Sequence, residues 1–193
     1  EFCRNGFLVL KAVVPDEINR RTCDYLNGEL PANPSYIPEG FTNEDLERIR
    51  SSHEPTTLIL EDWFVEQVLL NPQLAGALRS LLGKNVGLPV TLAKHSVQCP
   101  ASAQGWHHDA DCVFGPEINY LEVFYYPQDT PVETGPTQVL PGSHLIRNKA
   151  RFMAHLNGIR GAVPTASPAG SIFITTYQIW HRRGPQSDSR LRN

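Results

Sequence analysis

The chain has 193 residues and a mass of 21.6 kDa, and its 17 Lys and Arg against 20 Asp and Glu give a formal net charge of -3. This near-neutral balance excludes bulk charge as the basis for binding nucleic acid or a membrane surface, so an anionic ligand would need a local cluster of cations. The length suits one domain with its own hydrophobic core.

The N-terminal half alternates helical patterns with proline-containing loops. Pro15-Asp16-Glu17 is typical of a helix start, because proline is tolerated at the first position and carboxylates favour the positive end of the helix dipole. We expect this helix to reach Asn27-Gly28. A loop is expected from Pro31 to Gly40, and Thr42 with Asp45 resembles a weak capping box.

Apolar residues recur at helical spacing in two further stretches. The first stretch carries Phe64, Val65, Val68 and Leu69. The second is expected to begin at Asn71-Pro72 and to end at Gly83, and its apolar face carries Leu74, Ala77, Leu78, Leu81 and Leu82. Neither stretch carries chemistry, so we expect both helices to cover the core.

From residue 88 onward, short β-rich runs separated by turn residues replace the helical pattern. These runs are the alternating Leu88, Val90 and Leu92, then Ile118 to Tyr126, Gln138 to Leu140 and Ser171 to His181. Several short strands preceded by helices predict a mainly β fold, an antiparallel sandwich or jelly roll buttressed on one side by helices.

The cysteines give no sign of a structural zinc site. Cys3, Cys23, Cys99 and Cys112 lie far apart without close CxxC pairs, so we expect free thiols. No apolar run approaches the ~18 residues of a membrane span and no secretory leader opens the chain, which makes a cytoplasmic location the expectation.

The segment Trp106-His107-His108-Asp109 carries the clearest chemical pattern. On an extended segment alternate side chains share a face, so His107 and Asp109 project together while His108 points away. A second imidazole from an opposing strand would complete the two-His, one-carboxylate triad of non-haem Fe(II) oxygenases. Taken alone, the pair would also fit a structural hydrogen bond at a strand end, and Asp111 is an alternative carboxylate one alternation further on.

Several histidines could supply the second imidazole, namely His53, His95, His144, His155 and His181. We favour His181, because it closes an apolar run and is followed at once by Arg182 and Arg183, which could serve an anion beside the metal. His144 follows a Pro-Gly-Ser turn, and we expect it to order that turn.

In combination, these motifs resemble the phytanoyl-CoA dioxygenase (PhyH) family of Fe(II)/2-oxoglutarate-dependent oxygenases. The matching motifs, in the family's order, are Trp106 to Asp109, Gly135-Pro136, Pro141-Gly142-Ser143-His144, and His181 with Gly184-Pro185. The opening from Asn5 to Leu10, followed by a helix, is also similar. The resemblance implies a double-stranded β-helix (jelly roll, cupin-like) core with N-terminal helices buttressing one sheet. It also implies a single oxygenase domain over residues 1–193, which we expect to be incomplete at its C-terminus or to lack loops.

The resemblance also implies roles for individual residues. His107, Asp109 and His181 would bind Fe(II) and form the catalytic centre. Family members hold the distal carboxylate of 2-oxoglutarate with an arginine about eleven positions after the second histidine. That residue is Arg192 here, with Arg190, nine positions after His181, as the alternative. A guanidinium fork matches a carboxylate in a bidentate, charge-assisted pair.

Three further residues are expected at the cosubstrate. His108 occupies a position that often helps to bind 2-oxoglutarate in this family, and Phe124 aligns with an aromatic residue that lines the same pocket. Arg183 stands where the family often has a serine or another small polar residue, so we expect it to alter how the cosubstrate is held.

The implied activity is a dioxygenase that uses Fe(II), 2-oxoglutarate and O2 and releases succinate and CO2. We expect hydroxylation of a small-molecule substrate, natural-product or lipid-like, because Asp109 fills the position where related halogenases have Ala or Gly. Selectivity is expected in the loop from Asn33 to Ser52 and in the stretch after His144. A non-catalytic metal-binding jelly-roll protein and a zinc hydrolase with the same ligands are the alternatives. No nucleic-acid or membrane partner is expected, and the sequence gives no oligomeric state.

Overall fold

The computed structural model describes residues 1–29, 53–87, 92–95, 97, 100–109, 117–147, 152–153 and 155–193. Several sequence-based expectations lie outside these residues: the Pro31 to Gly40 loop, the Thr42 and Asp45 capping box, the selectivity loop from Asn33 to Ser52, strand positions Leu88 and Val90, Asp111, Cys99 and Cys112. Within the described part of the chain, Cys3 and Cys23 are free thiols, as expected.

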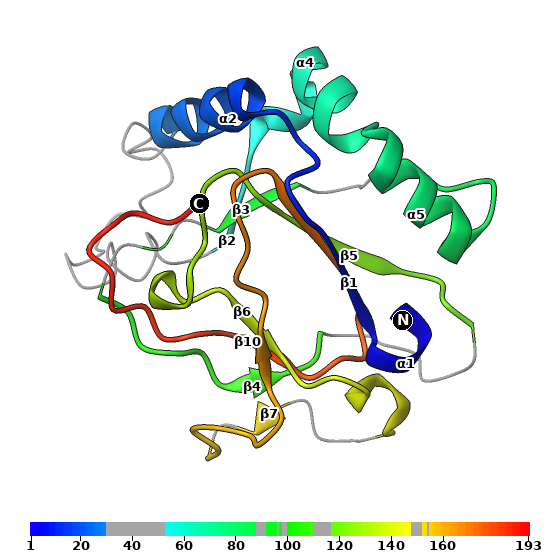
Figure 1. The fold of residues 1–193 in the computed structure, drawn as a ribbon, viewed down its shortest axis with the longest axis vertical. Helices are drawn as coiled ribbons and strands as arrows, with labels where there is room; N and C mark the ends of the chain where they lie inside the picture. Colours follow the sequence, from blue (N-terminus) through cyan, green and yellow to red (C-terminus); the bar gives the residue numbers. More distant parts are fainter. Residues whose placement is uncertain are drawn as a thin grey trace, which may run out of the picture.

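Two antiparallel sheets form the core of the described structure (Figure 1). The first has the order β1 (Phe7–Leu10), β9 (Ser171–Thr176), β5 (Leu121–Tyr126). The second has the order β7 (Phe152–Met153), β4 (Trp106–His107), β10 (His181–Arg183), β6 (Thr137–Val139), β8 (Val163–Pro164). A separate pair joins β2 (His53–Pro55) to β3 (Ala93–His95). This is the cupin-like jelly-roll class predicted from the sequence, and the described strands do not close into a barrel.

Most of the helical elements precede the β-rich half. They are α1 (Phe2–Asn5), α2 (Asp16–Glu29), η2 (Thr57–Leu60), α4 (Asp62–Phe64), the π-helical turn η3 (Val65–Leu69) and α5 (Pro72–Leu82), with the single turns η4 (Val132–Thr134) and η5 (Ser143–Leu145) between later strands. The three helices expected within the described residues are confirmed, the second of them as α4 continued by the π-helical η3. Asn71 caps α5, since its Oδ1 accepts from the backbone N–H of Gln73 at 3.0 Å. None of the described helices combines the length and apolar character needed to cross a membrane.

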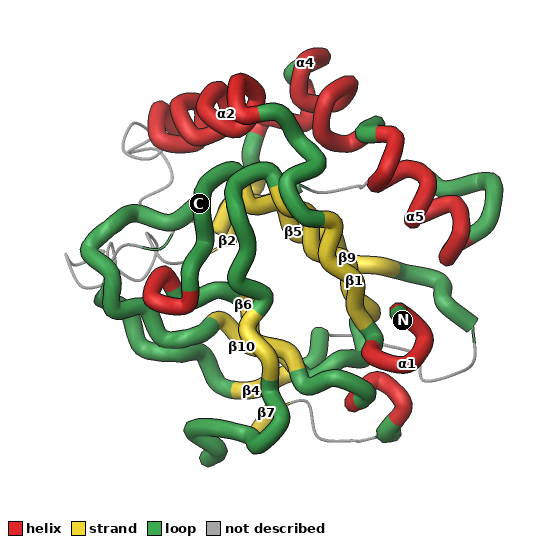
Figure 2. The backbone as a smooth tube through the Cα atoms, in the orientation of Figure 1, coloured by secondary structure: helices red, strands yellow, loops and turns green. Residues whose placement is uncertain are grey.

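Helices α2, α4 and α5 pack on the outer face of the β1-β9-β5 sheet (Figure 2). Ile172 and Ile174 of β9 are fully buried against this helical layer. Phe173, between them, points the opposite way and packs with Val139 and Ile179 between the two sheets. Strand β9 is therefore buried on both faces, which explains its continuous apolar sequence and confirms that the helices buttress one sheet.

Two strand assignments differ from the expectation. Residues Phe7–Leu10 form β1, which pairs with β9 along its length, although no strand was predicted there. The run from Ser171 to His181 is not one strand, because a turn after Thr176 directs the chain into the second sheet. The Ile179 N–H donates to the Thr176 carbonyl at 3.3 Å within that turn. His181 therefore opens β10 instead of closing β9.

Candidate metal centre

His107 and His181 lie on neighbouring strands of the five-stranded sheet. Strands β4 and β10 are antiparallel, and these two histidines are directly opposite each other in the register. Their ring centroids are 4.4 Å apart. Cross-strand neighbours on one face bring their side chains together, so the pairing of β4 with β10 is what joins two imidazoles that are distant in sequence.

Asp109 completes a cluster of three possible metal ligands. It follows β4 by two positions, and one ligand atom from each of His107, Asp109 and His181 lies within 4.8 Å of the others. The Asp109 Oδ2 atom is 3.7 Å from His181 Nε2. This oxygen is buried, and the Glu122 carboxyl lies beside it with a buried oxygen of its own, so the site needs a proton shared with Glu122 or an added cation.

Backbone carbonyls orient both imidazoles. The Nδ1 atom of His107 is 2.8 Å from the Gly105 carbonyl, and that of His181 is 3.1 Å from the Ile179 carbonyl. A carbonyl oxygen only accepts, so Nδ1 is the donor in each ring, and in the neutral form of the ring Nε2 has a lone pair for a metal. Burial lowers the pKa of His181, which favours the neutral form that binds metal.

The glycine motifs hold β10 in place. Gly135 has a left-handed φ of 65°, and a Cβ there would lie 2.6 Å from the Gly184 carbonyl oxygen. The Gly184 N–H donates to the Pro136 carbonyl at 3.0 Å. The Gly135-Pro136 turn and the Gly184-Pro185 segment thus form one close backbone contact directly after β10, and a side chain at position 135 would separate them.

The Pro141 to His144 turn fastens the residue that precedes His181. The Ser143 hydroxyl accepts the Trp180 N–H at 2.9 Å, and the Gly142 N–H donates to the Asn5 carbonyl at 2.9 Å. His144 Nε2 lies 3.0 Å from the Cys3 carbonyl. His144 therefore orders this turn, as expected from the sequence, and it links the N-terminal segment to the strand that carries a ligand.

The triad lies in the wall of a cavity of about 880 Å³, which strand β5 and residues of helices α2 and α5 also line. Strand β5 lines the side opposite the histidines through Glu122, Phe124 and Tyr126, which alternate along one face. Burial, and next the negative charge of the neighbouring Asp109, raise the pKa of Glu122 to about 9. Sequence reasoning did not identify Glu122. The available signal was an acidic residue within an otherwise apolar and aromatic strand.

Two arginines from different segments also line this cavity. Arg192 is 6% exposed, and one of its terminal nitrogens, Nη1, donates to the Gly135 carbonyl. Arg183 is half-buried, and its Nη2 donates to the Ser102 carbonyl at 3.0 Å. The Nε atoms of both arginines are buried and donate to no described acceptor. The cavity therefore presents two cations with unused donors.

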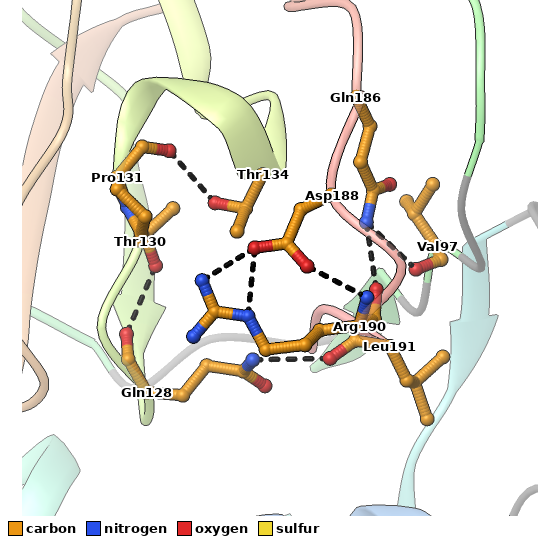
Figure 3. A network of polar contacts seen from close by, with 9 residues as sticks. All are labelled: Val97, Gln128, Thr130, Pro131, Thr134, Gln186, Asp188, Arg190 and Leu191. Carbon is orange, nitrogen blue, oxygen red and sulfur yellow. Dashed lines mark hydrogen bonds and ion pairs between the residues drawn. The ribbon is translucent and has the colours of Figure 1, made fainter.

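Arg190 lies on the surface instead. Its Nε donates to Asp188 Oδ2 at 2.8 Å, and Figure 3 shows the guanidinium lying against this carboxylate. In the same network Gln186 Nε2 donates to the carbonyl of Arg190 at 2.9 Å, and Gln128 Nε2 donates to that of Leu191 at 3.0 Å. These bonds fix the segment that leads to Arg192. Of the two arginines weighed from the sequence, the structure brings only Arg192 to the cavity.

The structure separates the remaining two expected cosubstrate residues. Phe124 lines the cavity and packs on Phe173, with ring centroids 5.4 Å apart. His108 is 4% exposed and packs edge-on against Trp180 at 5.0 Å, away from the cavity wall. The predicted alternation is confirmed, because His107 and Asp109 face the cavity while His108 turns the other way. For His108 to contact a cosubstrate in the cavity, its imidazole would have to leave Trp180 and adopt another rotamer.

Comparisons with known proteins agree with this arrangement. The model of the phytanoyl-CoA dioxygenase (PhyH) family matches residues 2–193. Among solved structures, the crystal structure of AviO1 from Streptomyces viridochromogenes Tue57 is similar, with a TM-score of 0.69 and 20% sequence identity, over 99% of this chain and 87% of that chain. At this identity the likeness shows the fold alone. No curated protein sequence matches the chain.

Proposed function

Because the chain belongs to the phytanoyl-CoA dioxygenase (PhyH) family, which makes it an oxygenase of the Fe(II)/2-oxoglutarate type, we propose that it hydroxylates a small-molecule substrate. One observation carries the proposal. The ligand atoms of His107, Asp109 and His181 lie within 4.8 Å of one another in the wall of a cavity of about 880 Å³. We also propose that residues 1–193 form a single oxygenase domain, which the family match over residues 2–193 supports.

The residues present fit Fe(II). Two imidazoles with free Nε2 lone pairs and one carboxylate are the donor set of a facial triad, which leaves half of an octahedral coordination sphere to reactants. The buried Asp109 Oδ2 atom, which lies beside the Glu122 carboxyl and 3.7 Å from His181 Nε2, would gain the metal as its counter-charge. His107, Asp109 and His181 are therefore the residues that would hold the iron.

The residues also fit 2-oxoglutarate. Arg192 offers a buried guanidinium whose Nε atom has no described partner, and Phe124 provides an apolar wall nearby in the same cavity. A buried guanidinium forms strong charge-assisted pairs with carboxylates. Arg192 would thus hold the distal carboxylate, while burial excludes water from that end of the site.

Bound together, the metal and the keto acid would supply the oxidation, in which one atom of O2 enters succinate, CO2 is released and the other atom enters the substrate. The protein's own contribution is orientation. The Gly105 and Ile179 carbonyls fix both imidazole planes, and the strand pair fixes their separation. The aromatic and aliphatic lining limits the access of water to the reacting centre.

The cavity supports a small-molecule substrate. Its volume of about 880 Å³ is within the usual range for small-molecule sites, and its wall combines apolar side chains with a few polar groups. A natural-product or lipid-like molecule would suit this lining. We propose no nucleic-acid or membrane partner, in line with the net charge of -3.

The experiment that tests this function is a comparison of metals with succinate as the product measured. The protein is loaded with Fe(II) or with Zn(II), supplied with 2-oxoglutarate and O2, and assayed for succinate with a panel of small apolar and polar molecules as substrates. We expect succinate from the Fe(II)-loaded protein and none from the Zn(II)-loaded protein. A true substrate should increase the amount of succinate. A non-catalytic metal-binding protein would yield no succinate with either metal, and a zinc hydrolase would turn over an ester or amide with Zn(II) only.

A further inference from the structure

The cavity is lined by one more arginine than a single arginine clamp would need. Arg183 and Arg192 both line it, and each has a buried Nε atom that donates to no acceptor among the described residues. Neither guanidinium forms an ion pair with a carboxylate in the described part of the chain. Two like charges that share a cavity without a counter-ion favour the binding of an anion between them.

Strand alternation directs Arg183 into the cavity. Arg183 is two positions after His181 on β10, so both side chains leave the same face of the sheet. Arg182, between them, leaves the opposite face of the strand and is 8% exposed, with its guanidinium 4.7 Å from the Trp106 ring centroid and its Nε donating to Gln138 Oε1 at 2.8 Å. The strand thus presents a metal ligand and a cation side by side toward the same space.

Arg183 and Arg192 converge on one short segment. Arg183 is opposite Thr137 in the β10–β6 pairing, and Arg192 Nη1 donates to the carbonyl of Gly135, two positions before Thr137. The backbone of Arg192 is held independently, by paired hydrogen bonds with Val97 at 2.8 and 3.0 Å. Burial lowers the pKa of Arg192, the neighbouring Tyr126 raises it, and the positive charge of the nearby Arg183 lowers it.

A carboxylate fits this pair better than it fits Arg192 alone. Its two oxygens offer about four acceptor sites, and a single guanidinium fills them only partly. Arg192 already uses Nη1 on the Gly135 carbonyl, and Arg183 uses Nη2 on the Ser102 carbonyl. Each arginine keeps Nε and one further terminal nitrogen, so the two forks together can satisfy both oxygens.

We propose that Arg183 and Arg192 together hold the distal carboxylate of 2-oxoglutarate, which makes Arg183 a second positioning residue that selects keto acids with a second carboxylate. This inference rests on the proposed function. It differs from a role of Arg183 in binding an anionic substrate, because a substrate contact would leave the affinity for the keto acid unchanged.

The test is an anaerobic titration of the Fe(II)-loaded protein with two keto acids, followed by the visible charge-transfer band that arises when a keto acid chelates such iron. One is 2-oxoglutarate, and the other is 2-oxopentanoate, which has the same chain length without the distal carboxylate. We expect Arg183→Gln to weaken 2-oxoglutarate binding by about tenfold or more and to leave 2-oxopentanoate binding unchanged. Arg183→Lys keeps the charge and should lose less. In turnover, Arg183→Gln should raise the KM for 2-oxoglutarate while kcat at saturation changes little.

Arg182→Gln is the matched control, because it removes the neighbouring arginine from the opposite face of the same strand. Unchanged 2-oxoglutarate affinity in both Arg183 variants would overturn the inference, as would an equal loss for both keto acids, which would place the effect on folding or on the metal. If wild-type protein gives no band with either keto acid while it binds Fe(II), the proposed function itself fails, a result distinct from failure of the two-arginine clamp.

Discussion

The imidazoles of His107 and His181 face each other across an antiparallel strand pair, with their ring centroids 4.4 Å apart. Each ring uses Nδ1 on a backbone carbonyl two residues earlier in its own chain segment, Gly105 for His107 and Ile179 for His181. The same local geometry therefore repeats on two strands and leaves two Nε2 atoms directed at one point. Backbone pairing alone therefore brings together the two imidazoles of the candidate metal centre.

The first prediction concerns metal binding. Asp109→Ala removes the only carboxylate of the cluster, and His107→Ala removes one imidazole. We expect each variant to lose Fe(II) binding by at least about a hundredfold and to lose succinate production, because a facial site with two ligands binds weakly. Metal analysis after anaerobic loading and desalting measures this. His155→Ala, at an exposed histidine, is the control. Full iron content in Asp109→Ala would refute the ligand assignment.

The second prediction distinguishes the two C-terminal arginines. Arg192→Ala should raise the 2-oxoglutarate concentration needed for half-maximal succinate production by about tenfold or more, since a buried charged donor is lost. Arg190→Ala should change it little, because Arg190 is bonded to Asp188 on the surface. Thermal melting of both variants checks their folding. A larger effect at Arg190 than at Arg192 would reverse the assignment.

The third prediction concerns the turn at Gly135. Gly135→Ala places a Cβ 2.6 Å from the Gly184 carbonyl oxygen in a left-handed backbone conformation, so we expect a loss of about 1–3 kcal/mol in the free energy of unfolding. Gly158→Ala is the control, because a Cβ there meets nothing within 4 Å. Chemical denaturation of both variants measures the difference. Equal stability in the two variants would show that the close approach of the backbones does not matter.

The fourth prediction concerns Ser143. Its hydroxyl accepts the buried Trp180 N–H next to His181, so Ser143→Ala should cost about 1–3 kcal/mol in the free energy of unfolding and weaken Fe(II) affinity. Ser189→Ala, at an exposed serine, serves as the control. Equilibrium unfolding and Fe(II) titration measure the two effects. If Ser143→Ala leaves the free energy of unfolding and the Fe(II) affinity unchanged, this turn does not position His181.

The fifth prediction is a pH dependence of the metal-free protein. Burial and Asp109 raise the pKa of Glu122 from its usual 4.5 to about 9 in the folded state. Between these values the folded protein holds a proton that the unfolded chain releases, so stability falls as pH rises through this window. Glu122→Gln should flatten the decline and raise the melting temperature by several degrees at pH 9. Glu117→Gln, at an exposed acid, should not. Parallel pH profiles for wild type and Glu122→Gln would contradict the burial argument.

Local patterns predicted the parts of this protein that depend on local geometry. The alternation of His107, His108 and Asp109 follows from the two-residue period of an extended chain, and the helix from Pro72 follows from its Asn71 cap. The surface position of Arg190 also had a local signal, since Asp188 lies two positions earlier.

Apart from the meeting of His181 with His107, several features that depend on pairing between distant segments were not predicted. The turn after Thr176 interrupts an apolar run that has the composition of one strand, so the sequence alone does not show that His181 begins another. The positions of Glu122 beside Asp109 and of Arg183 in the same cavity as Arg192 depend on which strands line the cavity. Residue type was visible at these positions, but the neighbours that give each residue its chemistry come from other elements.

The most direct test of the metal centre is a crystal structure of the protein loaded with Fe(II) under anaerobic conditions, with anomalous scattering recorded at the iron edge. We predict one iron peak, at about 2.0–2.2 Å from each of three atoms: Nε2 of His107, Nε2 of His181 and a carboxylate oxygen of Asp109. A peak at another place, or one coordinated without His181, would contradict it.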